Sequence, residues 1–536
     1  MSAPLASVDA SADICLLLEG TFPFVRGGVS SWVNDMLHAF PEKRFAIVFL
    51  GSRKEDYQDA AYPLPDNVVH LETHFLYESG PPHGKRRRPI EGDAQAFAHS
   101  ANLHAALRAR RNDAGITRLI ASVLSMLGDD DALNEAQFST SRRAWDYITE
   151  QYREHCTDPS FTDYIWTVRT MHQPIWKLAR IAQGLAPARV YHTVSTGYAG
   201  LLGAMLRQRS HRPLLVSEHG IYTKERKIEL LQSQWLSDNR GTFEHDILEG
   251  SYFRELWGRF FEALGKLAYH SASDIISLYE GNRRRQIDDG APAHRTHCIP
   301  NGVDIARFGA LRTARRAGKR QVVAMIGRVV PIKDVKTFIR SIFIAAQTMP
   351  DIEGWIVGPE EEDRGYANEC LALARNLGLA ERLRFRGFQR IDDVLPHVDV
   401  LALTSISEAL PLVVLEGFAA GIPAVVTDVG SCRQLIEGQD GDDRALGMAG
   451  SVVPLADPIR FARALTALLS NETQWRDAQA AGLARVQRYY TRAAMVDSYR
   501  ELYQRLLASD DVPTDRALPP QCPVAGQPLR TPQRGY

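Results

Sequence analysis

Short apolar runs alternate with stretches of helical pattern through most of this chain, and this alternation restricts the fold more than any other feature of the sequence. It is typical of parallel sheets whose strands are joined by helices. The strands predicted in the first half are Ile14–Leu18, Phe45–Leu50, Val68–Leu71, Arg189–His192, Leu214–Ser217 and Asp274–Leu278. Those predicted in the second half are Val322–Ile326, Gly354–Val357, Leu383–Arg386, Val398–Leu403 and Ala424–Thr427. Because 536 residues are too many for one ordinary core, we expect an α/β protein with two domains.

The expected domain limits follow from where this rhythm stops and resumes. The first domain is expected over residues 1–305, with a mostly helical insertion at about 75–185, and the second over 306–485. A last helix within 486–509 is predicted by four apolar residues at helical spacing, Met495, Tyr499, Leu502 and Leu506. Residues 510–536 are rich in proline and poor in large apolar side chains, which favours disorder or a segment draped over the surface.

Composition excludes several classes of protein. The formal net charge is −1, whereas nucleic-acid binders usually carry a strong basic excess. The six cysteines show neither a CxxC pair nor metal-ligand spacing, a pattern that suits reduced thiols in the cytosol. The first residues, MSAPLASVDASAD, lack the features of a signal peptide, and no uncharged apolar run approaches the ~20 residues that cross a bilayer. We therefore expect a cytoplasmic protein that neither binds nucleic acid nor inserts into a membrane.

The segment EGTFPFVRGGVSSWV, residues Glu19–Val33, is the first candidate for a ligand site. A strand ends at Glu19, and an amphipathic helix is predicted to begin near Ser30. Between them, Gly27 and Gly28 would let a ligand approach the backbone, and the amides at a helix start favour an anion. A tight turn that needs positive φ is the alternative explanation of the two glycines.

The segment GRVVPIKD, Gly327–Asp334, follows a predicted strand and precedes a predicted helix. Arg328 offers a bidentate fork and Lys333 a compact charge, a combination that suits a diphosphate. Two solvated surface cations are the alternative explanation.

Two glutamates, Glu408 and Glu416, are separated by seven residues in SEALPLVVLEGFAAGIPAVVTDVG. Pro411 suits the first turn of a helix, so Glu408 is expected in the preceding loop and Glu416 inside the helix. A rise of ~1.5 Å per residue puts them on the order of 12 Å apart, about the span of a nucleotide sugar from ribose to hexose. Carboxylates are good acceptors for paired sugar hydroxyls. Either residue alone is more often a solvated helix residue.

In this order and spacing, IPNGVD (Ile299–Asp304), GRVVPIKD and the two glutamates resemble glycosyltransferase family 4, whose members have the GT-B fold of two Rossmann-like domains facing a central cleft. The opening segment at Glu19–Val33 and SEHGIYTKERKIEL, which begins at Ser217, resemble more particularly the soluble glycosyltransferases of Pel exopolysaccharide systems. The resemblance covers roughly residues 13–505 apart from the insertion.

The resemblance implies a role for individual residues. Arg328 and Lys333 match the cations that bind the diphosphate, Glu416 the glutamate that holds the ribose hydroxyls, and Glu408 the one against the donor sugar. Further residues implied in donor binding or catalysis are Gly27 and Gly28 on the phosphate side, His219 beside the donor sugar, Leu412 after Pro411, and Gly387 and Phe388 near the base. On its own, a strand-end histidine such as His219 is more often structural. The last helix is implied to cross back to the first domain, a helix that caps its own domain being the alternative.

Two positions depart from the family pattern. Ala409-Leu410-Pro411 stands where many relatives have Gly-Phe-Gly, which puts the backbone contacts to the sugar in doubt. Gln434 stands where relatives often carry Glu, which puts one polar contact in doubt.

The implied activity is retaining, metal-independent transfer of a hexose or N-acetylhexosamine from a UDP-sugar to a growing exopolysaccharide. No cofactor or metal is expected. The implied partners are the sugar donor, a glycan acceptor and inner-membrane proteins of a polysaccharide synthase complex. Asp129–Asp131 contains a DxD match, but it lies in the insertion and away from a strand end, so no metal role is assigned to it. Two rival functions stay open, a non-catalytic sugar-nucleotide-binding scaffold and a UDP-hexosamine epimerase.

Overall fold

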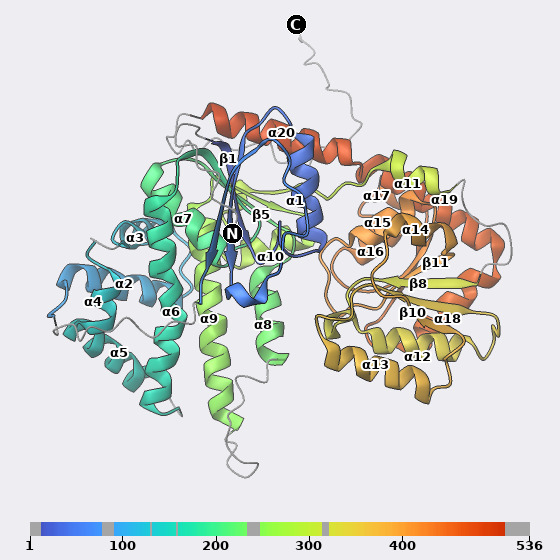
Figure 1. The fold of residues 1–536 in the computed structure, drawn as a ribbon, viewed down its shortest axis with the longest axis horizontal. Helices are drawn as coiled ribbons and strands as arrows, with labels where there is room; N and C mark the ends of the chain where they lie inside the picture. The colour runs from blue at the N-terminus through green and yellow to red at the C-terminus, as the bar shows by residue number, and fades with distance from the viewer. Residues whose placement is uncertain are drawn as a thin grey trace, which may run out of the picture. The chain divides into compact units, whose positions relative to one another are not determined.

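The structure is a computed structural model that describes residues 12–77, 90–128, 131–156, 159–232, 247–312 and 321–509. Asp129, Asp130 and the tail from residue 510 therefore lie outside the described residues. The described chain forms two compact units, one of residues 12–298 with 501–509 and the other of residues 299–500 (Figure 1).

The first unit is built on a seven-stranded sheet of order β3-β2-β1-β4-β5-β6-β7, in which every neighbouring pair is parallel. Every residue of β2 is buried, as expected for a strand covered on both faces. The strands are β1 (Ala12–Glu19), β2 (Phe45–Gly51), β3 (Val68–Phe75), β4 (Ala188–Thr193), β5 (Leu214–Glu218), β6 (Asp274–Ser277) and β7 (Thr296–Cys298).

The second unit holds a six-stranded parallel sheet of order β10-β9-β8-β11-β12-β13. Its strands are β8 (Val322–Ile326), β9 (Glu353–Val357), β10 (Leu383–Phe385), β11 (Val400–Leu403), β12 (Ala424–Thr427) and β13 (Gly450–Val453). The two parallel sheets confirm the predicted α/β class.

Helices cover the faces of each sheet in Figure 1. In the first unit they are α1 (Gly28–Ala39), α2 (Ala94–Arg108), α3 (Ala114–Leu124), α4 (Glu135–Thr140), α5 (Arg142–His155), α6 (Phe161–Gly184), α7 (Tyr198–Ser210), α8 (Tyr222–Gln232), α9 (Ile247–Ser271) and α10 (Glu280–Asp288). Those that follow are α11 (Ile305–Leu311), α12 (Val335–Ala345), α13 (Arg364–Asn376), α14 (Ile391–Val394), α15 (Leu412–Ala419), α16 (Cys432–Glu437), α17 (Gly441–Arg444), α18 (Pro458–Ser470), α19 (Glu472–Tyr489) and α20 (Arg492–Ala508).

The helices between β3 and β4 extend the core of the first unit. Leu103 of α2, Ile116 of α3 and Leu178 of α6 belong to the same buried cluster as Cys15 of β1 and Val48 of β2. The helical segment therefore adds to the layer on one face of the sheet. No helix among the described residues is long and apolar enough to cross a membrane.

Every predicted strand is present, although several ends are shifted. Two strands were not predicted, β7 (Thr296–Cys298) and β13 (Gly450–Val453). Each stands at one edge of its sheet and is only three or four residues long. Such short segments carry too few residues for an apolar pattern to stand out.

A buried ion pair joins helices near the end of the second unit. Arg485 of α19 is 0% exposed and pairs with Asp443 at 2.6 Å between Nε and Oδ1. The same guanidinium donates to the carbonyls of Leu435, Ile436, Asp443 and Gly447. These bonds satisfy a charge that would otherwise be costly to bury, and they join α19 to the ends of α16 and α17.

Replacing Arg485 by methionine should destabilise the protein strongly, because Asp443 would remain buried without its cation. We expect a loss of about 3–5 kcal/mol in the free energy of unfolding, measured by chemical denaturation. Arg488→Met is the matched control: it lies on the same helix, and its partner Asp442 is exposed at 3.1 Å. The control should lose less than about 1 kcal/mol, and equal losses would contradict the assigned role of Arg485.

Candidate functional site

Each sheet has one point where the strand order reverses, between β1 and β4 in the first unit and between β8 and β11 in the second. Ligands of open α/β sheets bind beyond the carboxyl ends of the strands at such a point. The segments that follow these four strands are therefore the places to look for a site.

In the second unit, two of the predicted residues meet at the reversal point. Lys333 follows β8 and Glu408 follows β11, and Lys333 Nζ lies 2.5 Å from Glu408 Oε1. Their side chains are 21% and 13% exposed. Ser405 donates its hydroxyl to the same carboxylate oxygen at 2.6 Å. The pair is thus shielded from most solvent and yet open on one side.

The two loops that carry this pair are joined to each other. Thr404 Oγ1 donates to the carbonyls of Lys333 and Asp334, both at 3.0 Å. The amide of Ile406 donates to the carbonyl of Ile332 at 2.9 Å. These bonds fix the segment before α12 against the segment before α15, so the positions of Lys333 and Glu408 depend on one hydrogen-bonded unit.

Arg328 lies at the start of the same loop, in a more exposed setting. Its Nη1 lies 2.5 Å from Oε1 of Glu362, with side-chain exposures of 47% and 50%. The amide of Val329 donates to the carbonyl of Pro359 at 3.0 Å, which holds the loops of the two residues together. Exposed ion pairs contribute little to stability, so Arg328 can exchange Glu362 for another anion. Sequence reasoning did not find Glu362.

Helix α15 begins directly beyond the Lys333–Glu408 pair. Its N-cap is Pro411, which makes no side-chain capping bond, so the first amides, beginning at Leu412, can bind an anion. Glu416 lies in the second turn and is half-buried, next to the buried side chains of Leu415 and Phe418. The structure therefore places Glu408 in the loop and Glu416 in the helix, as the sequence predicted.

Gly387 and Phe388 follow β10, two strands from β8. Gly387 has φ 59°, and its carbonyl accepts from the amide of Gly358 at 2.9 Å. The ring of Phe388 is 59% exposed. A large exposed aromatic ring at a strand end suits stacking on a planar base.

In the first unit, Gly27 and Gly28 lie at the exposed start of α1. Gly27 has φ 168°, which is extended backbone, so a turn that needs positive φ does not explain this glycine. A Cβ built there meets nothing within 4 Å. The start of α1 has no side-chain cap, which leaves its amides able to bind an anion.

His219 follows β5, next to the strands of the reversal point. Burial lowers the pKa of its imidazole to about 4, so the ring is neutral at pH 7. Its Nε2 atom is buried and has no hydrogen-bond partner among the described residues. A buried polar atom without a partner is costly and is characteristic of a ligand contact.

The residue before it, Glu218, is 1% exposed and anchors the strand end. It accepts from Thr196 Oγ1 at 2.8 Å, from Gln286 Nε2 at 2.9 Å and from the hydroxyl of Tyr269. Burial raises the pKa of this carboxyl group. All three donors are neutral and come from other segments. They therefore hold the end of β5 in place, and with it the backbone of His219, the next residue.

Glu19 occupies the reversal point of the first sheet, at the end of β1. Its carboxylate accepts from the hydroxyls of Tyr222 at 2.9 Å and Ser195 at 3.3 Å and from the amide of Ala199 at 3.1 Å. It therefore joins β1 to the start of α7 and to α8. The sequence placed Glu19 at a strand end but gave no sign of these partners, which come from distant segments.

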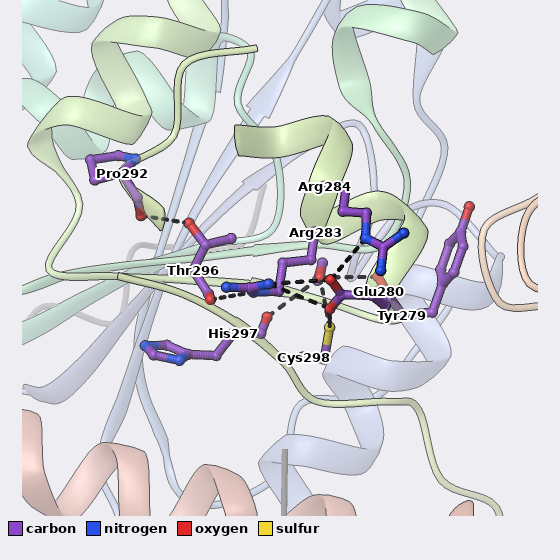
Figure 2. A network of polar contacts seen from close by, with 9 residues as sticks. Tyr279, Glu280, Arg283, Arg284, Pro292, Thr296, His297 and Cys298 are labelled. Carbon is purple, nitrogen blue, oxygen red and sulfur yellow. Dashed lines mark hydrogen bonds and ion pairs between the residues drawn. The ribbon is translucent and has the colours of Figure 1, made fainter. Parts of the chain in front are cut away.

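A separate polar network lies at the ends of β6 and β7 (Figure 2). Glu280 accepts from Arg283 at 3.3 Å and from Arg284 at 3.1 Å, and the thiol of Cys298 lies 3.8 Å from its Oε2 atom. Arg283 also donates to the carbonyl of Thr296 at 2.7 Å. The network binds α10 to β7 and holds the last residues before the second unit.

Among the described residues, no group of three or more His, Cys, Asp or Glu side chains is arranged to hold a metal ion. Asp131, the described member of the DxD match, lies 3.7 Å from Arg209.

Similar structures have the same architecture. The chain is similar to HepE of Anabaena, solved in complex with UDP-glucose, with a TM-score of 0.53 and 15% identity, over 92% of this chain and 99% of that one. It is also similar to a sucrose-phosphate synthase from Thermosynechococcus elongatus, with a TM-score of 0.55 and 15% identity, over 92% and 99%. At these identities the likeness establishes the fold, which is GT-B.

Curated relatives match part of the chain. A D-inositol 3-phosphate glycosyltransferase of Geodermatophilus obscurus is 27% identical over 275 residues, which cover 48% of this chain and 58% of the relative. The lipopolysaccharide core biosynthesis glycosyltransferase LpsE of Rhizobium meliloti is 27% identical over 242 residues, which cover 44% and 66%.

Two family models match the chain in succession. The model described as Glycosyl transferases group 1 matches residues 320–471, which include Arg328, Lys333, Glu408 and Glu416. The model described as a domain of unknown function, DUF3492, matches residues 12–294, more than half of the chain. The protein therefore belongs to the DUF3492 family, and it joins that domain to a group 1 glycosyl transferase domain.

Proposed function

We propose that the protein is a retaining glycosyltransferase that transfers a hexose or an N-acetylhexosamine from a UDP-sugar to a growing exopolysaccharide. The observation that carries the proposal is the contact of Lys333 with Glu408 at 2.5 Å, at the reversal point of the second sheet and beside the uncapped start of α15. A cation, a carboxylate and free helix amides suit a sugar diphosphate in one place. HepE, which is similar in fold, is bound to UDP-glucose.

The diphosphate would bind to Arg328, Lys333 and the first amides of α15. Arg328 would leave Glu362 for the diphosphate, whose two negative charges exceed the single charge of a carboxylate. Glu416 would accept from the ribose hydroxyls, and Phe388 and Gly387 would take the base. Glu408 would accept from the donor sugar while it keeps Lys333 in place.

The reaction breaks the bond between the anomeric carbon and the diphosphate oxygen, and the electron pair leaves with UDP. Lys333 and Arg328 stabilise the negative charge that develops on this oxygen. The sugar passes through an oxocarbenium-like state, and the acceptor hydroxyl attacks from the face that UDP leaves. Its proton passes to the departing phosphate oxygen, which lies on the same face, so the anomeric configuration is retained.

From the first unit we propose that His219 contributes to the donor sugar and the Gly27–Gly28 segment to the phosphate side. A neutral imidazole with an unpartnered Nε2 atom can hydrogen-bond a sugar hydroxyl without adding charge. We also propose that α20 is the helix that crosses back to the first domain. This is supported by its residues 501–508, which group with the first unit.

The proposed product is a Pel-like exopolysaccharide. It is supported by the resemblance of the segments at Glu19–Val33 and from Ser217 onward to the transferases of those systems. On this proposal the enzyme works in the cytoplasm and reaches the inner membrane through protein partners of a synthase complex.

Replacing Lys333 by alanine tests the central contact. We expect the Kd for UDP, measured by calorimetry, to rise about 10- to 100-fold, because a charge-assisted bond is lost and Glu408 is left without its cation. Turnover of the preferred UDP-sugar should fall about 10²- to 10³-fold. Lys336→Ala is the matched control: Lys336 lies on α12 and pairs with Glu369 at 2.6 Å, and its loss should leave both values unchanged.

The same assay separates the rival functions. A binding scaffold would bind UDP without any acceptor-dependent release of UDP, and an epimerase would convert the donor when no acceptor is present. Wild-type protein that binds neither UDP nor any UDP-sugar would refute the proposal.

We expect sugar transfer without a metal ion, because Arg328 and Lys333 would supply the positive charge that a divalent ion supplies in other glycosyltransferases. Purified protein treated with EDTA and assayed in EDTA should keep its rate within about twofold, whereas one lost metal contact would cost several kcal/mol. Restoration of a lost rate by added Mg²⁺ or Mn²⁺ would overturn this expectation.

Gly430 allows the backbone of the Glu408 loop to pack directly against its own backbone. It has φ 55°, and a Cβ built there would lie 2.2 Å from the carbonyl oxygen of Glu408. We expect Gly430→Ala to weaken UDP binding about tenfold, equivalent to ~1.4 kcal/mol, because the loop must move. Gly378→Ala is the control: Gly378 has φ 69° and nothing within 4 Å of its built Cβ. This variant should lose only ~1–2 kcal/mol in the free energy of unfolding, because alanine disfavours the left-handed backbone conformation. The Kd for UDP should stay unchanged.

A further inference from the structure

One face of α1 carries two buried apolar side chains at helical spacing, Trp32 and Met36, and the buried Phe40 follows the helix as its C-cap. Residues four positions apart lie on the same side of a helix. Trp32 is 3% exposed, and its ring contacts two histidines, His192 of β4 and His219 directly after β5. The ring centroids lie 4.6 Å from His219 at an interplanar angle of 65° and 5.9 Å from His192 at 88°. Trp32 therefore lies against both imidazoles.

His192, one of the two histidines in contact with Trp32, is held firmly in place. It is 0% exposed, its Nδ1 lies 2.8 Å from the hydroxyl of Tyr503, and its Nε2 lies 2.8 Å from the hydroxyl of Ser217. Burial lowers the pKa of His192 to about 3, so the ring is neutral, with one nitrogen that donates and one that accepts. Each hydroxyl can take either role. Both nitrogens are satisfied, which fixes the plane of this ring.

His219 is held differently. Its Nε2 has no hydrogen-bond partner among the described residues, so no bond at that atom sets the direction in which the ring points. Its backbone is anchored through Glu218, whose carboxylate accepts hydrogen bonds from Thr196, Gln286 and Tyr269. The imidazole itself packs against the ring of Trp32 in an edge-to-face contact, which aromatic rings prefer.

We propose that Trp32, backed by the Tyr503–His192–Ser217 hydrogen bonds, is the positioning residue that directs His219 toward the donor sugar. This inference rests on the role of His219 in the proposed function. Trp32 touches no substrate in this scheme and acts only through the imidazole. Trp32 lies in α1, which begins at Gly27–Gly28. The same helix would therefore support the glycine segment on the phosphate side and the imidazole of His219 beside the donor sugar.

The first experiment compares Trp32→Leu with Trp32→Phe in the full-length protein. Leucine keeps an apolar residue but removes the ring, and a shift of about 1 Å in a reacting group can cost ~10²-fold. We expect kcat for the preferred UDP-sugar to fall at least ~10-fold in Trp32→Leu and to recover to within ~3-fold of wild type in Trp32→Phe. The Kd for UDP should change much less than kcat, because Arg328, Lys333 and the first amides of α15 lie in the second unit, whereas the first unit is proposed to contribute only the Gly27–Gly28 segment on the phosphate side.

Met36→Ala is the matched control. Met36 lies on the same face of α1, one turn from Trp32, is 1% exposed and lies outside the Tyr503–His192–Ser217 hydrogen bonds. Its loss should lower the melting temperature as Trp32→Leu does, yet leave kcat near the wild-type value. Equal losses of kcat in the two variants would reduce Trp32 to a packing residue and overturn the inference.

A double-mutant cycle with His219→Ala gives the sharper test. If Trp32 acts only through His219, the double variant should be no slower than His219→Ala alone, whereas independent effects multiply. A further fall of ~10-fold in the double variant would refute the positioning role. If His219→Ala keeps wild-type kcat while UDP still binds, the role of His219 fails and this inference fails with it. Absence of UDP binding in the wild-type protein would instead refute the proposed function itself.

Discussion

The contact between Lys333 and Glu408 depends on the order of the strands in the second sheet. Because β11 pairs with β8 and not with β10, the chain returns to the middle of the sheet after it has built one side. The loops after β8 and β11 therefore meet, although 75 residues separate the two side chains. The hydrogen bonds of Thr404 then fix the two loops to each other. Parallel pairing thus brings a cation and a carboxylate together before any ligand is involved.

The carboxylates nearest the proposed donor-binding residues are held in different ways in the two units. In the second unit, Lys333 and Arg328 each face a carboxylate, so ions are held where a charged ligand can compete for them. In the first unit, Glu218 is held by neutral donors. A fully enclosed ion pair, Arg485 of α19 with Asp443 of α17, lies later in the chain and joins these helices.

The sequence predicted those features that depend on local pattern. Strand positions, the loop setting of Glu408 and the helical setting of Glu416 follow from apolar runs and from Pro411, and the structure confirms them. What it could not predict depends on contacts between distant segments. Glu362 contacts Arg328 from the segment after β9, and Ala199 and Tyr222 contact Glu19 from α7 and α8. No local pattern encodes such pairs.

The neutral state of His219 and His192 in the first unit follows from burial. An imidazole that loses water loses its charged form first, and both His219 and His192 have a pKa far below neutrality for that reason. Neutral imidazoles can hydrogen-bond a sugar hydroxyl without adding charge. In the proposed scheme, the packing of Trp32 on His219 would set the direction of this ring, its burial keeps the ring uncharged, and Arg328 and Lys333 supply the positive charge for the diphosphate.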